Sequence, residues 1–117
     1  WRIWMPRSVR FNARSSLDWS RLAWRARYHP HELVRLSGVS RRQLQRLCQD
    51  RMGLGLEDWL YQQRLMAAGY LLPETGSVKE AAFAAGYPSA AQLSREFKRF
   101  HGITPGQYLE RFRIWWG

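Results

Sequence analysis

The sequence predicts an all-α protein in which a long central helix joins two helix-turn-helix lobes. Helix signals recur along all 117 residues, and no stretch alternates convincingly between apolar and polar residues as a strand does. One pattern occurs twice, and each copy reads as a short helix, a tight glycine turn and a capped helix. The apolar fraction of 45% is ordinary for a globular protein, so a core can form.

The two copies of the pattern lie 49 residues apart, and the segment 39–47 returns as 88–96. A repeat of this length is one supersecondary unit used twice. The matched pairs are Ser40 and Ser89, Gln43 and Gln92, Leu44 and Leu93, Arg46 and Arg95, Gly53 and Gly102, Leu54 and Ile103, Trp59 and Tyr108, Leu60 and Leu109, and Arg64 and Arg113.

Two helices are expected before the turn of the first copy. The first spans about 17–28, and one of the serines at 15–16 can cap it. The second spans about 31–37, because Pro30 suits a first helical turn and Gly38 suits a left-handed helix end.

The first copy continues with a capped helix and a long amphipathic one. The helix over about 40–51 opens with a Ser-x-x-Gln capping box, and Gly53 ends it. The helix over about 56–72 follows, and we expect Pro73 and Gly76 to break it. Its apolar positions, expected to face a core, are Trp59, Leu60, Leu65, Met66, Ala67, Tyr70 and Leu71.

The second copy repeats this plan. A short helix starts at Ser77 and ends at Gly86, and a capped helix over about 89–100 follows. A last helix is expected over about 104–113, behind a Thr-Pro-x-Gln cap. The core residues expected on the 89–100 helix are Leu93, Phe97 and Phe100.

The charge of the chain favours a polyanionic partner, with nucleic acid first and an anionic membrane surface second. The net charge is +10 and the pI about 11.0. Residues 1–51 hold twelve arginines against three acids, whereas residues 52–117 hold seven basic residues against six acids. Most basic residues are arginines, which form bidentate contacts with phosphate and guanine. A biased genomic base composition explains the arginine excess equally well.

Cysteine content and hydropathy favour the cytoplasm, where a nucleic-acid partner would associate the protein with the nucleoid. The single cysteine, Cys48, excludes an internal disulfide and indicates a reducing compartment. No apolar run approaches the ~18–20 residues that cross a membrane, and no signal peptide is visible. Because the first residue is Trp1, we expect the natural start to be missing. Whether the chain lacks a further domain because it is trimmed from a longer protein or because it is natively short stays open.

The second copy carries the most specific pattern: Val-Lys-Glu-Ala-Ala-Phe-Ala-Ala-Gly-Tyr at 78–87, Leu-Ser-Arg-Glu-Phe-Lys-Arg-Phe at 93–100 and Gly-Ile-Thr-Pro at 102–105. With the matching residues of the first copy and the helix around Arg64, it resembles the DNA-binding domain of the AraC/XylS family of bacterial transcription regulators. The resemblance covers about 17–113, nearly the whole chain.

The resemblance implies seven helices. Lobe one is expected over about 17–55 and lobe two over about 77–113, with a linker helix of about 56–72 between them. Residues 1–15 would be a basic N-terminal arm or a linker in front of the domain at 16–117. A linker helix of this length is ~25 Å long, and with its flanking turns it could set two recognition helices about one DNA turn, ~34 Å, apart.

The family's base-reading positions fall on the two recognition helices, about 40–51 and 89–100. An arginine can grip O6 and N7 of guanine, and a glutamine can grip N6 and N7 of adenine. The implied base-reading residues are Arg42, Gln45 and Arg46 on the first helix, and Ala91, Gln92 and Arg95 on the second, beside Ala90. The residues expected near phosphate are Ser40, Arg41, Gln49, Ser89, Lys98 and Arg99.

The second helix departs from richer family members, because alanine can at best touch a thymine methyl group. We therefore expect lobe one to supply most affinity and specificity, and lobe two to position and clamp. Gln43 and Gln92 also occupy capping-box positions, and capping is the favoured interpretation of both. The roles of the terminal tryptophans and of four early arginines stay open; they are Trp1, Trp4, Trp115, Trp116, Arg2, Arg7, Arg10 and Arg14.

No catalysis, metal site or cofactor is expected. The histidines show no ligand spacing with Cys48, which we interpret as a small buried residue, and no nucleophile or paired carboxylates stand out. The expected partners are double-stranded DNA and RNA polymerase, and a separate effector or dimerisation domain, common in the family, is not visible. Two rivals stay open: a basic aromatic protein that binds nucleic acid without sequence preference or an anionic membrane surface, and an interaction module that uses the tryptophan-rich ends.

Overall fold

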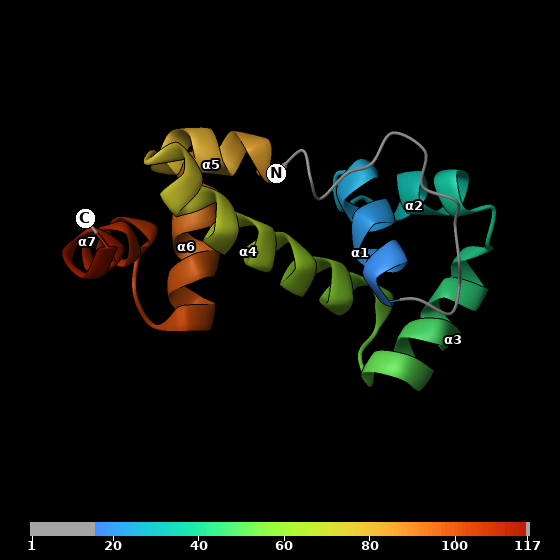
Figure 1. Cartoon of the computed structure of the whole chain (residues 1–117). Coiled ribbons are helices and arrows are strands. Elements are labelled where there is room, and N and C mark those ends of the chain that lie inside the picture. Colours follow the sequence, from blue (N-terminus) through green and yellow to red (C-terminus); the bar gives the residue numbers. More distant parts are fainter. Residues whose placement is uncertain (1–15, 117) are drawn as a thin grey trace. The chain divides into compact units, whose positions relative to one another are not determined.

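The computed structural model describes residues 16–116, and the side chains of residues 18–113 (Figure 1). Every regular element in this part of the chain is a helix, which confirms the predicted all-α fold. The predicted arm at 1–15, the first tryptophans and the side chains of the last ones lie outside the described residues. The helices are α1 (Ser16–Arg25), α2 (Pro30–Ser37), α3 (Arg41–Met52), α4 (Leu56–Thr75), α5 (Val78–Ala84), α6 (Ala90–His101) and α7 (Pro105–Trp116).

The chain forms two compact units, and the division falls within α4, between Gln63 and Arg64. Each unit holds one copy of the repeated pattern: α2 and α3 in the first, α5 and α6 in the second. The repeat predicted from the sequence is therefore a repeat of structure.

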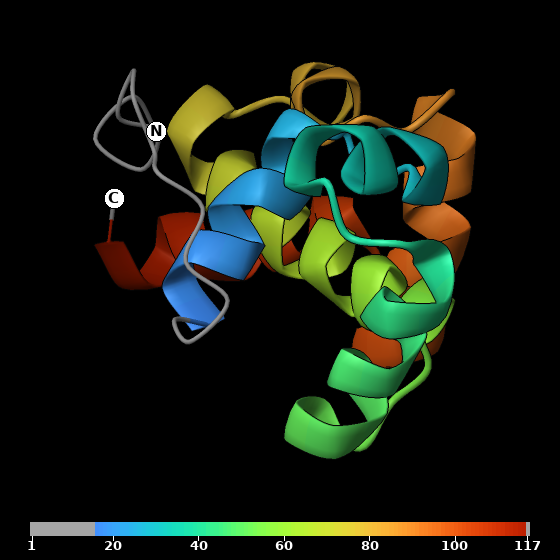
Figure 2. The same cartoon turned by 90° about the vertical axis from the view of Figure 1, so that its right-hand side faces the viewer.

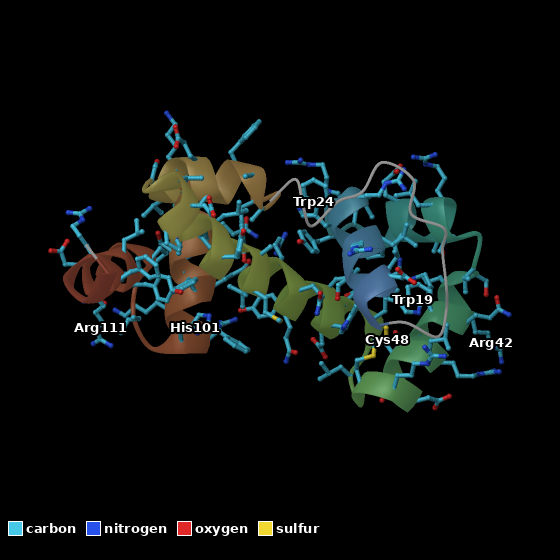
Figure 3. The ribbon with its side chains drawn as sticks, viewed as in Figure 1. Trp19, Trp24, Arg42, Cys48, His101 and Arg111 are labelled. Atoms are coloured by element: carbon cyan, nitrogen blue, oxygen red, sulfur yellow. The ribbon has the colours of Figure 1, made fainter. Side chains whose placement is uncertain are left out.

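In the first unit, α2 packs against both α1 and α3 (Figure 2). The core side chains come from all three helices and from the start of α4: Trp19, Leu22, Leu33, Leu44, Cys48, Leu56, Trp59 and Leu60. Trp19 and Cys48 lie close together, on α1 and α3 (Figure 3). Burial raises the pKa of the Cys48 thiol to about 11, because the thiolate would lose its hydration, so the thiol is neutral at pH 7. The interpretation of Cys48 as a small buried residue is confirmed.

In the second unit, α6 packs against α5 and α7. The Phe97 ring is fully buried and contacts the ring of Tyr108 on α7, with centroids 5.4 Å apart. The other buried side chains of this unit are Leu65, Ala67, Ala68, Leu71, Leu72, Ala81, Ala82, Ala85, Tyr87, Leu93 and Pro105.

Three residues expected in the core are exposed instead. Met66 and Tyr70 are 66% and 46% exposed, because they lie one turn apart on the side of α4 that its buried residues leave open. Phe100 is 51% exposed, because it lies in the last turn of α6, where its ring contacts the His101 ring at a centroid distance of 5.0 Å.

The central helix is longer than predicted. We expected Pro73 to break it after residue 72, but α4 continues through Pro73 to Thr75. A proline this close to a helix end removes a single backbone bond, to the carbonyl of Gly69, and its own φ suits a helix. The Thr75 hydroxyl donates to the Leu71 carbonyl at 2.9 Å, and the helix ends at Gly76, where φ is +67°.

The four predicted capping motifs all mark helix starts, but only two are reciprocal. Ser40 accepts from the Gln43 amide at 3.2 Å, and the Gln43 side chain accepts from the Ser40 amide at 3.3 Å. Thr104 and Gln107 form the same pair of bonds, at 3.1 and 2.9 Å. Ser77 before α5 and Ser89 before α6 each accept a hydrogen bond from the backbone amide three residues later. The side chain of that later residue does not bond back to the serine amide.

Candidate nucleic-acid interface

One face of α3 is polar, exposed and basic. Arg42, Arg46 and Gln49 are all exposed, on the side of the helix away from the buried Leu44 and Cys48. Arg42 extends away from the ribbon of α3 (Figure 3). Among residues 16–116, neither Arg42 nor Arg46 forms an ion pair, so both guanidinium groups can take an external anion or base edge.

Two other predicted contact residues of α3 are bound to the first turn of α4. The guanidinium of Arg41 forms an ion pair with Glu57, with 2.6 Å between nitrogen and oxygen. The side-chain oxygen of Gln45 accepts a hydrogen bond from the Leu56 amide at 2.9 Å. Both side chains therefore connect α3 to α4, a role that their sequence positions did not reveal.

The corresponding face of α6 carries Ala91, Arg95 and Lys98, all exposed, and Arg99 beside them. Ser94, which corresponds to Gln45, is half-buried. A hollow of about 450 Å³ on this face is lined by Gln92, Arg95, Glu96 and Arg99. The face is basic like that of α3, but Ala91 and Ser94 lie where α3 has Arg42 and Gln45.

Gln92 belongs to a polar network within the second unit. Its side-chain amide donates to Glu96 at 2.9 Å, and Glu96 in turn accepts from Arg64 of α4 at 3.2 Å. The guanidinium carbon of Arg64 lies 4.3 Å from the centre of the Tyr87 ring. The capping interpretation of Gln92 is therefore wrong, whereas that of Gln43 is confirmed. The sequence did contain a signal for this bond, because side chains four residues apart on a helix, such as Gln92 and Glu96, are neighbours.

The helix-capping serines stand at the amino ends of the two recognition helices. Ser40 and Ser89 are exposed, and each hydroxyl already accepts a hydrogen bond from a backbone amide of its own helix. The free amides of a helix start attract anions, so this is a suitable place for a phosphate.

The sequence reasoning overlooked an acid on α3. Asp50 is exposed and follows Arg46 by one turn. The 49-residue register pairs it with Arg99, so the two recognition helices carry opposite charges at this position.

Away from α3, Arg35 donates to Glu32 at 2.7 Å on α2, and this hydrogen bond lowers the pKa of the Glu32 carboxyl.

The described residues form neither a metal-binding cluster nor a membrane span. Between residues 16 and 116, His, Cys, Asp and Glu side chains form no group of three or more that could bind a metal ion. In the same part of the chain, no helix combines the length and the apolar character needed to cross a bilayer.

The sequence of this chain is similar to those of known proteins. A family model described as "Helix-turn-helix domain" matches residues 33–111. The chain is 40% identical over 80 residues to the HTH-type transcriptional regulator GlxA of Rhizobium meliloti, which is 68% of this chain and 25% of that protein. It is 33% identical over 92 residues to the putative HTH-type transcriptional regulator YkgA of Escherichia coli, covering 75% of this chain and 38% of that protein.

A third relative is the HTH-type transcriptional regulator RipA of Corynebacterium glutamicum, 32% identical over 77 residues, or 66% of this chain and 23% of that protein. The chain thus spans well under half the length of these relatives. No solved structure matches the chain.

Proposed function

This chain belongs to the AraC-type helix-turn-helix family of DNA-binding transcription regulators, and we propose that it binds double-stranded DNA at a specific sequence and regulates transcription there. The observation that carries the proposal is the face of α3, where Arg42 and Arg46 are exposed and without an ion pair in the described part of the chain. Arginines of this kind on a recognition helix can contact guanine in the major groove.

The proposed base-reading residues differ between the helices. On α3 they are Arg42 and Arg46, and each bidentate contact with guanine discriminates against another base by ~1–3 kcal/mol. On α6 they are Arg95, which can contact guanine, and Ala91, whose methyl group can touch that of a thymine. Gln45 and Gln92 each already bond one amide atom within the protein, and a bidentate contact with adenine needs both atoms.

The proposed phosphate contacts surround these positions. Lys98 and Arg99 are exposed cations beside the reading face of α6. Gln49 occupies the same face of α3, and Arg41 can contact phosphate only by sharing its charge with Glu57. Ser40 and Ser89 would bring phosphates to the helix starts. Such contacts orient the protein without reading the sequence.

We propose that α3 and α6 enter successive major grooves. The 20-residue α4 belongs to both units and is about 30 Å long at 1.5 Å per residue. That length is close to one turn of B-DNA, ~34 Å. One chain could then read a long site that is not a palindrome.

The first unit is proposed to supply most of the affinity. The first unit, residues 1–63, holds twelve arginines against five acids, whereas the second, residues 64–117, holds seven basic residues against four acids. The α6 face also carries alanine at two of the family's reading positions. Because phosphate neutralisation dominates protein–DNA affinity, the more basic unit should contribute more.

The wider role follows from the family and is proposed on that basis. The protein would act in the cytoplasm on chromosomal DNA and contact RNA polymerase, and an effector or dimerisation domain would accompany it, since its relatives are much longer. The proposed activity is binding, without a catalytic step or a cofactor.

Selection of bound sequences from a random DNA pool tests the proposal. We expect one long enriched site, bound in the presence of excess random DNA and weakened steeply by salt. Enrichment of no sequence would show a protein that coats nucleic acid, and equal binding to anionic vesicles would favour a membrane surface; either result overturns the proposal.

The contributions of the two units are tested on the selected site. Arg46→Ala should weaken binding more than Arg95→Ala, by about tenfold against about threefold, and should relax preference at one base pair. Arg25→Ala and Arg111→Ala are matched controls, since both arginines are exposed but lie outside the recognition helices. A larger loss for Arg95→Ala would contradict the unequal division.

A further inference from the structure

The start of α4 lacks a capping side chain of its own. Gly55 stands at the cap position, because its carbonyl accepts the first helical bond, from the Trp59 amide at 2.9 Å. The first amides of a helix have no acceptor within the helix, and a glycine offers none. The Leu56 amide is nevertheless bonded, at 2.9 Å, to the side-chain oxygen of Gln45 on α3. A residue of the recognition helix thus supplies the missing acceptor.

The second copy of the pattern solves the same problem differently. In the 49-residue register, Gly55 corresponds to Thr104 and Leu56 to Pro105. Thr104 caps α7 locally, in a reciprocal box with Gln107. Pro105 has no amide hydrogen to be satisfied. Ser94, at the place of Gln45, therefore has neither a donor to meet nor the length to reach one.

Gly55 also makes room for the glutamine. A Cβ placed on Gly55 would lie 3.3 Å from the side-chain nitrogen of Gln45, tighter than an ordinary contact. The backbone of Gly55 is not in the left-handed region, so conformational freedom does not explain this glycine. Beside it, Arg41 of α3 pairs with Glu57 at 2.6 Å. The first turn of α4 is therefore held to α3 at two successive residues.

We propose that Gln45 is a positioning residue: it caps α4 from the recognition helix and fixes α3 against α4, so that Arg42 and Arg46, and not Gln45, read the bases. The effect on base reading rests on the proposed DNA-binding function, whereas the cap is a feature of the protein without DNA. A glutamine whose oxygen is bonded to Leu56 cannot offer both amide atoms to adenine without breaking that bond.

Hydrogen exchange on the free wild-type chain tests the cap directly. The Leu56 and Glu57 amides both lie in the first turn of α4, where no helical acceptor exists. We expect the Leu56 amide to exchange at least about tenfold more slowly than that of Glu57, and to lose this difference in Gln45→Met. Equal rates in the wild type, or an unchanged Leu56 rate in the variant, would overturn the inference.

Gln45→Met keeps the length and the helix propensity of the side chain and removes the acceptor. Its melting temperature should fall by about 4 °C, the shift expected for a lost cap in a domain of this size. Gln49→Met is the matched control, one turn further along the same exposed face, and should melt like the wild type.

DNA binding separates positioning from reading. Gln45→Met should weaken binding about threefold on the selected site and on each of its single-base variants alike, leaving the base preference unchanged. A changed preference at one base pair with an unchanged melting temperature would show that Gln45 reads a base, and would overturn the inference.

A second substitution separates positioning from capping. Gln45→Ala, which leaves space for a Cβ at residue 55, is compared with Gln45→Ala combined with Gly55→Ser. The added serine restores a local cap, like Thr104 in the second copy, without restoring the bond between α3 and α4. The melting temperature should recover while the affinity for DNA stays low. Recovery of both would show that Gln45 only caps α4, and would overturn its positioning role. If the wild type enriches no sequence at all, the proposed function and the reading consequence fail together, whereas melting and hydrogen exchange still judge the cap.

Discussion

At the scale of residues, the described arginines divide by what they contact. Arg35, Arg64 and Arg113 pair with acids inside the protein, whereas Arg42 and Arg46 extend from α3 without an ion pair in the described residues. Opposite charges within reach neutralise one another, so a paired arginine contributes less to the field that attracts DNA. On the proposed interface, the exposed cations without an ion pair in the described residues are Arg42 and Arg46 on α3 and Arg95, Lys98 and Arg99 on α6.

Asp50 should weaken DNA binding, because it puts a negative charge one turn after Arg46 on the exposed part of α3. Asp50→Asn is expected to raise affinity about threefold at low salt, and the gain should fade as salt screens the charges. Glu80→Gln, which removes an exposed acid outside the recognition helices, measures the effect of net charge alone. Equal gains for the two variants would show that Asp50 lies away from the DNA.

Cys48 should make the protein less stable in alkali. Its folded-state pKa is raised to about 11 by burial, above that of an exposed thiol, about 8.5. The unfolded chain therefore loses the thiol proton first, and the free energy of unfolding falls as the pH rises between these two values. Urea unfolding at pH 7 and pH 10 should show a larger loss for the wild type than for Cys48→Ala. Identical losses would mean that the thiol is hydrated in the folded state.

At the scale of elements, α4 is the helix to which both recognition helices are bonded. In the first unit Gln45 and Arg41 bond to its first turn. In the second unit Glu96 of α6 pairs with Arg64 of α4, and both side chains are only 17% exposed. In a pair this shielded from water, loss of either side chain leaves the other charge without a partner, which destabilises the contact between α6 and α4. In each unit, therefore, a helix of the repeated pattern is held to the part of α4 that belongs to the same unit.

Arg64→Leu should destabilise the protein by about 1–3 kcal/mol, because it leaves the Glu96 carboxylate shielded and unpaired. Arg113→Leu is the control given by the repeat register: its pair with Glu110 is 69% and 64% exposed and should contribute less than about 1 kcal/mol. Denaturant unfolding measures both. Adding Glu96→Leu to Arg64→Leu should recover most of the loss, and no recovery would assign the effect to the Tyr87 contact.

At the scale of the whole molecule, two similar units carry unequal charge. Residues 1–51 hold twelve of the nineteen basic residues of the chain. At three positions where α3 carries Arg41, Arg42 and Gln45, α6 carries alanine or serine. The proposed function requires that α3 and α6 read two parts of one DNA site at a defined spacing.

The spacing of the DNA site tests this arrangement. Inserting about five base pairs between the two halves of the selected site turns the second half to the opposite face of the duplex. Affinity should fall about tenfold, to that of the first half alone, while a chain with Arg95→Ala should lose much less. An unchanged affinity after the insertion would show that α6 does not read DNA together with α3.

The sequence by itself determined the helices, their starts and the faces on which the proposed contacts lie. Capping serines, glycine turns and 3.6-residue periodicity are local signals, so Ser40, Gly38 and the buried Leu44 could be recognised without knowing the fold. The doubled pattern made the second copy predictable from the first. The expected break at Pro73 failed because one lost backbone bond near a helix end is too small a penalty to stop α4.

Only the tertiary structure decided which polar side chains are engaged inside the protein. Gln45 and Arg41 were indistinguishable in sequence from residues that contact DNA. Their partners Leu56 and Glu57 were known as residues, but a hydrogen bond depends on distances of about 3 Å. Those distances are set by how α3 packs against the first turn of α4, which no local pattern encodes. Gln92 differs, because its bond to Glu96 joins residues one turn apart in α6 and competes with a cap at the same helix start.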